Sequence, residues 1–174
     1  MNISNPRRTI RSEEDEEIMS PFGDNDSWDD ESFNIESSTP NDVLNTLSKN
    51  ICYVKAQNVA IEVATISKEL AKKKDFLVLD NYLGQLVRSS SSVAANMAEG
   101  SFCGNTTRDK MNKFRIAARE AIESINWITL LMKIGEIPKS KADELIEELS
   151  NITCILSKSI KTMQTKLNQE TKKK

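Results

Sequence analysis

The sequence predicts an all-α protein: an up-down-up-down four-helix bundle over residues 41–174, preceded by a disordered acidic N-terminal arm over residues 1–40. From about residue 42 onward, apolar residues recur at spacings of three and four, which is the period of one helix face. Alternating β-branched runs and Asn-Gly or Asp-Gly hairpin turns, the usual signs of strands, do not occur in the sequence. The connections between the helical segments are short, which favours antiparallel neighbours in a bundle.

The arm differs from the rest of the chain in charge and in apolar content. Residues 1–50 hold 4 lysines and arginines against 12 aspartates and glutamates, whereas residues 51–174 hold 20 against 14. A polar, acidic segment cannot bury enough apolar surface to offset the entropy of ordering, so the arm is expected to be disordered. Two interpretations stay open, a solubilising tail and a short docking motif that uses Phe22, Trp28, Phe33 and Ile35.

Two helices are expected in the first half of the bundle. The first runs from about Asp42 or Ser48 to Lys74, and the second from about Phe76 to Glu99, with Gly100 as a natural stop. The side chains that we expect in the core are Val54, Val59, Val63, Ile66 and Leu70 in the first helix, and Leu79, Leu83, Leu86, Val93 and Met97 in the second.

Two further helices are expected, at about 108–134 and 141–166. Thr106 or Thr107 can cap the third helix, Gly135 makes the turn after it, and Ser140 with Asp143 resembles a capping box for the fourth. The expected core residues are Met111, Phe114, Ala118, Ile125, Ile128 and Met132 in the third helix, and Ala142, Leu145, Leu149, Ile152, Leu156, Ile160, Met163 and Leu167 in the fourth.

The composition argues against an enzyme or a metal protein. Histidine, the commonest metal ligand and general base, does not occur in the chain. The three cysteines, at positions 52, 103 and 154, form no Cys-x-x-Cys pair, so neither a zinc site nor a disulfide framework is indicated. No apolar run approaches about 18 residues, the length that a membrane span needs. We therefore expect a cytoplasmic protein with no cofactor, no metal and no membrane partner.

The third helix carries the best candidate binding surface. Arginines at i, i+7 and i+11 align in a row on a helix, and such a row can neutralise successive phosphates of RNA or DNA. A solvated helix face is the alternative interpretation of the same pattern. The predicted nucleic-acid-binding residues are Arg108, Lys110, Lys113, Arg115 and Arg119, together with Lys72, Lys73 and Lys74 at the end of the first helix.

The second helix is built largely from serine and alanine over residues 86–100. The serines at 89–92 lack a histidine base, so packing explains them better than catalysis. Arg88 and Glu99 lie eleven residues apart, about three turns, and so share a helix face. We expect both to pair with charges on a neighbouring helix or subunit, because buried charges persist mainly when they are paired.

Two motifs resemble a known family. They are Gln85-Leu-Val-Arg-Ser-Ser-Ser-Ser-Val-Ala-Ala-Asn-Met-Ala-Glu-Gly100 and, in the third helix, Arg119-Glu120-Ala-Ile-Glu123 followed by Trp127. Both are similar to the four-helix-bundle family known from 23S rRNA intervening sequences, which includes the accessory variability determinant protein of diversity-generating retroelements. The resemblance covers about residues 50 to 167.

This resemblance implies a homopentamer with a central channel, in which Arg88, Asn96, Glu99 and Trp127 have structural or assembly roles. In the retroelement branch it also implies a basic surface that binds nucleic acid and a reverse transcriptase partner. The predicted function is therefore a non-enzymatic, oligomeric nucleic-acid-binding accessory protein. The alternative is a structural or protein-interaction bundle without a nucleic-acid role. The acidic arm departs from the family, and it is expected to compete with nucleic acid for the basic face.

Overall fold

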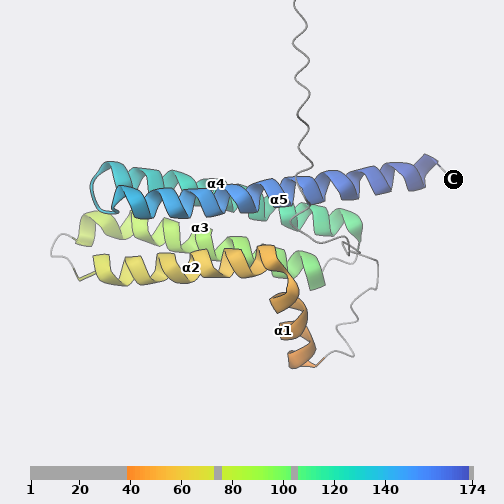
Figure 1. Ribbon diagram of the computed structural model, residues 1–174, viewed down its shortest axis with the longest axis horizontal. Helices are drawn as coiled ribbons and strands as arrows, with labels where there is room; N and C mark the ends of the chain where they lie inside the picture. Colours follow the sequence, from red (N-terminus) through yellow and green to blue (C-terminus); the bar gives the residue numbers. More distant parts are fainter. Residues whose placement is uncertain (1–38, 73–75, 103–105, 173–174) are drawn as a thin grey trace, which may run out of the picture. The chain divides into compact units, whose positions relative to one another are not determined.

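The computed structural model describes residues 39–72, 76–102 and 106–172, in which all regular secondary structure is helical (Figure 1). The predicted all-α class is confirmed, but the number of helices is five in these ranges and not the expected four. The helices are α1 (Pro40–Lys49), α2 (Ile51–Leu70), α3 (Phe76–Phe102), α4 (Thr107–Lys133) and α5 (Lys139–Lys172). The predicted disorder of the arm concerns residues that lie almost entirely outside the described ranges.

The additional helix arises because Asn50 divides the first predicted helix in two. Its backbone is extended, with φ −82° and ψ 99°, and its side chain accepts a hydrogen bond from the Tyr53 amide at 3.1 Å. Asparagine is a strong N-cap because its side chain replaces the missing intrahelical acceptor. α1 has its own capping box, in which Thr39 and Asp42 bond reciprocally and hold the pKa of the Asp42 carboxyl below its usual value. Thr39 therefore belongs to the folded part of the chain.

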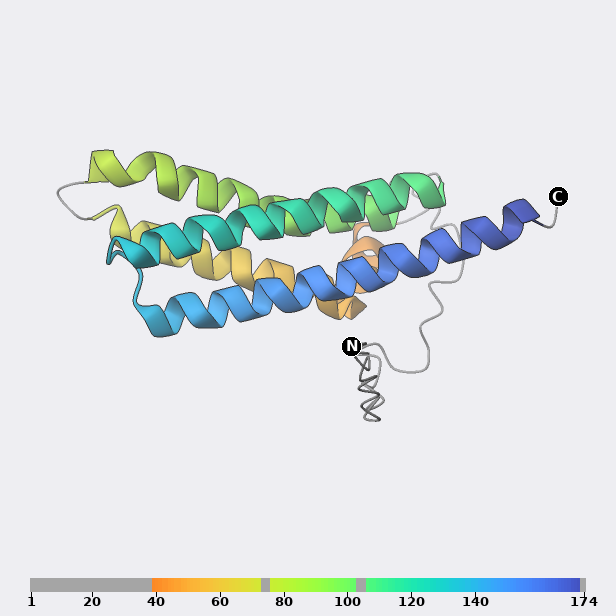
Figure 2. The same ribbon diagram turned by 90° about the horizontal axis from the view of Figure 1, so that it is seen from above.

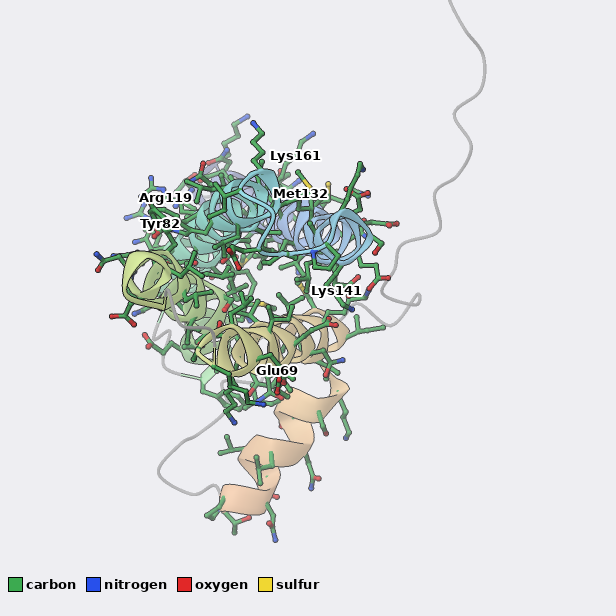
Figure 3. The ribbon with its side chains drawn as sticks, turned by 90° about the vertical axis from the view of Figure 1, so that its left-hand side faces the viewer. Glu69, Tyr82, Arg119, Met132, Lys141 and Lys161 are labelled. Atoms are coloured by element: carbon green, nitrogen blue, oxygen red, sulfur yellow. The ribbon has the colours of Figure 1, made fainter. Side chains whose placement is uncertain are left out.

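The four longer helices pack around one core. α3 packs against α2 and α4, and α5 packs against α4 and α2, so α2 and α4 lie diagonally opposite each other. The view along the helices in Figure 3 shows this arrangement, and Figures 1 and 2 show that consecutive helices from α2 to α5 run antiparallel. The contact between α2 and α5 carries two ion pairs, Lys55 with Glu148 at 2.6 Å and Lys141 with Glu62. Hydrogen bonds to Glu144 and Glu62 raise the pKa of Lys141 above its usual range.

Most of the predicted core is confirmed, with one systematic shift in α4. The buried positions there include Ala117, Ala121, Ser124 and Leu131, whereas the predicted Ala118, Ile125 and Met132 are half-buried. The buried face of α4 is therefore rotated toward its small residues, because α3 presents small residues opposite them and the two helices can approach closely. Val54, Ile66, Ile160, Met163 and Leu167 are likewise half-buried and not part of the closed core.

The helix ends correct two further predictions. α3 does not stop at Gly100 but continues to Phe102, and α5 begins at Lys139, so Ser140 lies inside its first turn and is not its cap. Two predictions are confirmed: Thr106 caps α4 by accepting from the Asp109 amide at 3.2 Å, and Gly135 makes the following turn with φ 82°. Positive φ is a conformation that glycine adopts without steric cost.

Gly100 is a point of close approach between α3 and α4 and not a helix stop. A Cβ atom at this position would lie 2.9 Å from Phe114 Cε1 and 3.1 Å from Lys113 Cβ. The Phe114 ring is itself buried, so it has little room to move away. Glycine at 100 therefore allows the two helix backbones to come together.

A matched pair of glycine substitutions tests this close approach. Gly100→Ala is expected to destabilise the fold by about 1–3 kcal/mol, because the added methyl overpacks the contact with Phe114. Gly84→Ala is the control, since nothing lies within 4 Å of a methyl group at that position and alanine favours helix by about 0.5–1 kcal/mol. Urea unfolding followed by circular dichroism measures the free energy of unfolding of both variants. Equal shifts in the two variants would contradict the proposed role of Gly100.

Candidate nucleic-acid interface

The arginine row predicted on α4 lies on the outer side of that helix. Arg108 and Arg119 are exposed, and Arg115 is half-buried and donates to Asn112 Oδ1 at 3.0 Å. Figure 3 labels Arg119 at the outer surface of the molecule. The helical rise of about 1.5 Å per residue spreads the row over about 16 Å. The structure thus brings these three arginines together on one line.

The other predicted basic residues do not join this row. Lys113 forms an ion pair with Glu99 of α3, and Lys110 is half-buried. Lys72 is exposed at the end of α2 and pairs with Glu69 at 2.8 Å. Lys73 and Lys74 lie outside the described residues. The candidate interface therefore reduces to the arginines of α4, of which two are exposed.

Arg88 is held by a polar cluster that spans α3 and α4. Its guanidinium donates to Gln85 Oε1 at 2.9 Å and to Glu123 Oε1, and its Nη1 lies 3.7 Å from Glu120 Oε2. Glu120 Oε2 is buried and accepts no hydrogen bond from a described residue. The nearby charge of Arg88 therefore offsets the free-energy cost of burying this carboxylate oxygen. The expected pairing of Arg88 with a neighbouring helix is confirmed. The expected pairing of Glu99 with a neighbouring helix is confirmed in the same way by its ion pair with Lys113.

Trp127 closes the cluster on the α4 side. Its indole Nε1 donates to Glu123 Oε1 at 3.2 Å, and its ring stacks on Tyr82 with centroids 6.0 Å apart and planes at 28°. Glu123 thus accepts from both Arg88 and Trp127. Because residues of both sequence motifs meet here, the cluster fixes the register of α3 against α4.

The serine-rich part of α3 is packing surface. Ser89 and Ser124 are fully buried, and their hydroxyl oxygens lie 2.8 Å apart across the α3–α4 contact. Ser90 donates to the carbonyl of Val87 at 3.2 Å, and Asn96 donates to the carbonyl of Ser92 at 2.9 Å. Each of these buried polar groups therefore has a hydrogen-bond partner, which avoids the free-energy cost of burying it unpaired. This arrangement supports the structural interpretation of Asn96 and of the serines.

Within the described residues, the chemistry of a metal or redox site is not assembled. No group of three or more cysteine, aspartate and glutamate side chains is placed to hold a metal ion there. Cys52 and Cys154 are free thiols, and burial raises the pKa of Cys52 to about 12. Cys103 lies outside the described residues. No helix in the described ranges is long and apolar enough to cross a membrane.

Sequence reasoning missed two features of the surface. The carboxylates of Glu120 and Glu123 were not expected to receive Arg88, although their i, i+3 spacing places them on one side of α4. Exposed apolar residues were also missed: Ile61 on α2 is 62% exposed, and Ile122 on α4 is 57% exposed. Ile61 lies two residues, about half a turn, from the buried Val59 and Val63, so it is on the outer side of α2, which a search for the core stripe passes over.

The comparisons with known proteins agree on one family. The model of the 23S rRNA-intervening sequence protein family matches residues 48–158. A solved structure from Bacteroides thetaiotaomicron, described as a protein with unknown function from the S23 ribosomal protein family, is 26% identical with a TM-score of 0.59. That match covers 64% of this chain and 96% of the other chain. Among curated proteins, no sequence matches.

Proposed function

Because the chain belongs to the 23S rRNA-intervening sequence protein family, we propose that it is a non-enzymatic, oligomeric protein that binds RNA or DNA through phosphates. In this proposal it is a cytoplasmic accessory protein of the retroelement type that partners a reverse transcriptase, and its four long helices form the bundle of that family. The observation that carries the proposal is the arginine row on the outer side of α4.

The row suits a phosphate backbone better than it suits base recognition. Arg108 and Arg119 are exposed at the two ends of a line of about 16 Å, with Arg115 between them. A nucleic-acid duplex carries one charge per about 1.7 Å of its axis, so a row of this length faces several phosphates. Phe114, the aromatic residue between Arg108 and Arg119 in the sequence, is buried in the core and is not available to stack on bases. Binding would therefore be electrostatic and insensitive to base sequence.

Assembly is supported by apolar side chains on two separate faces. Ile61 of α2 and Ile122 of α4 are largely exposed, and their helices lie diagonally across the core. A contact between two different faces of the same chain is heterologous, and such contacts form a ring where the rotation between neighbours closes and an open filament where it does not. We infer a closed ring in which the Ile61 face of one subunit meets the Ile122 face of the next, with the five subunits that the family resemblance implies.

A structural or protein-interaction bundle is the second candidate. It is favoured by the limited number of free cations on α4, since Lys113 is paired with Glu99 and Arg115 is bonded to Asn112. In that case the basic row contributes to solubility or to contact with a protein partner, and nucleic acid is not bound.

Charge reversal in the row tests the nucleic-acid proposal. Arg108→Glu with Arg119→Glu is expected to weaken binding to duplex DNA or RNA and to reduce the slope of log K against log salt by about 2, at about 0.9 per lost phosphate contact. Fluorescence anisotropy at several salt concentrations measures both quantities. The control pair Lys49→Glu and Lys68→Glu changes the net charge equally at exposed sites on α1 and α2. Equal losses in the two pairs, or no binding by the wild-type protein at low salt, would contradict the proposal.

Light scattering tests the assembly. The pentamer has an expected mass of about 98 kDa, five times the chain mass of 19.6 kDa. Ile61→Glu and Ile122→Glu should each reduce the mass to that of the single chain, because either change places a charge in the same contact. Ser150→Glu on the exposed side of α5 is the matched control and should leave the pentamer intact. A wild-type monomer, or a loss of assembly in the control alone, is incompatible with the ring.

A further inference from the structure

The second half of α5 carries a second row of cations. Lys158, Lys161 and Lys172 are exposed, and no ion pair links any of them to another residue in the described ranges. Their spacings of three and eleven residues, about one and three turns, keep them on one side of the helix. We call them the α5 lysine row, which is about 21 Å long at a rise of about 1.5 Å per residue.

The face that carries the α5 lysine row is polar. Thr165, between the second and third lysines, is exposed. Ile160 follows Lys158 by two residues, over half a turn, so it lies on the other side of the helix, where it continues the buried stripe and is half-buried. Glu170, the single acid between 157 and 172, precedes Lys172 by the same interval. Such a face suits phosphates better than an anionic membrane, because an interfacial helix turns its apolar side to the lipid.

The α5 lysine row points away from α2. Lys141 marks the α2 side of α5, because it forms an ion pair with Glu62 of α2. Lys161 follows Lys141 by twenty residues, about five and a half turns, and so lies on the opposite side of the helix. Figure 3 shows Lys161 and Arg119 at the surface on the side of the molecule away from α2, on which Glu69 is labelled. The lysines are therefore on the same outer side as the arginines of α4.

The two rows also lie at the same level along the bundle. α4 and α5 pack against each other and run antiparallel (Figures 1 and 2). Arg115 is eighteen residues before the end of α4, and Lys158 is nineteen residues after the start of α5, so both lie about 28 Å from the turn. The axes of packed helices are about 8–10 Å apart. The arginines and the lysines therefore belong to one basic surface with two rows.

We propose that the α5 lysine row binds the phosphates of one strand of a nucleic-acid duplex while the α4 row binds those of the other strand. This inference rests on the proposed nucleic-acid function and adds a second contact and a preference for duplex. The two backbones of a duplex border grooves about 6 and 12 Å wide, a separation that long side chains on two neighbouring helices can match. A single strand has one backbone and follows one row.

The α5 lysine row is a feature of this chain and does not follow from its family. The family match ends at residue 158, so Lys161 and Lys172 lie beyond it. The lysines add to the two exposed arginines of the α4 row, Arg108 and Arg119. The second row thus supplies the unpaired cations in which the α4 row by itself is poor.

Charge reversal on α5 tests the inference. Lys158→Glu with Lys161→Glu is expected to weaken binding to a fluorescein-labelled DNA duplex and to reduce the slope of log K against log salt by about 2, at about 0.9 per lost phosphate contact. Binding of the labelled strand alone should change no more than in the control pair Lys49→Glu with Lys68→Glu, which alters the net charge equally at exposed sites. Lys158→Arg with Lys161→Arg should keep the wild-type slope. Fluorescence anisotropy over a salt series measures all of them, with circular dichroism confirming each fold.

The outcomes separate this inference from the proposed function. If the wild-type protein binds duplex and the α5 pair loses no more than the control pair, the α5 lysine row is not a contact and the proposed function stands. If the wild-type protein does not bind at low salt, both are wrong. An equal loss with duplex and single strand would contradict the two-strand contact. Binding to vesicles of phosphatidylserine and phosphatidylcholine in place of duplex, abolished by the α5 pair, would identify a membrane contact and overturn the inference.

Discussion

The close packing of α3 on α4 is the contact on which the rest of the structure depends. Two buried serines face each other at 2.8 Å in this contact, and Gly100 allows the backbone of α3 to approach the Phe114 ring. Buried hydroxyls contribute a net stabilisation of about 0.5–1.5 kcal/mol each when paired, but leaving one unpaired costs about 1–3 kcal/mol. The small residues therefore fix one register of the two helices, and the ion pairs of Arg88 and Glu99 with α4 reinforce the same register.

This contact also determines which residues are available for function. Polar side chains of the two family motifs, among them Arg88 and Glu123, bond one another across α3 and α4, whereas Arg119 of the second motif is exposed on the outer side of α4. The surfaces left for partners are the outer side of α4, which carries the arginines and, seven residues after Arg115, Ile122, the exposed Ile61 of α2, and the second half of α5. Each proposed interaction uses these outward surfaces.

The sequence predicted the approximate bounds of α3, α4 and α5, the cap at Thr106 and most of the core, because hydrophobic periodicity and capping act locally. It did not predict the break at Asn50, where a side-chain cap competes with continued helix between two segments of similar apolar pattern. Gly100 was wrongly expected to be a stop, because local propensity cannot show that Phe114 lies against that position. Of the candidate site, the alignment of the α4 arginines follows from spacing, whereas the partners of Lys113 and Arg88 depend on tertiary packing.

Native-state hydrogen exchange tests the central role of the α3–α4 contact most directly. Regions that open only with global unfolding exchange with the full free energy of unfolding, and peripheral regions exchange with less. Amides of α3 between Gly84 and Gly100 and of α4 between Met111 and Leu131 should exchange only through global unfolding, whereas those of α1 and of α5 beyond Leu156 should open locally. If α3 or α4 opens at a lower free energy than α2 or the first half of α5, the α3–α4 contact is not the contact that the fold depends on.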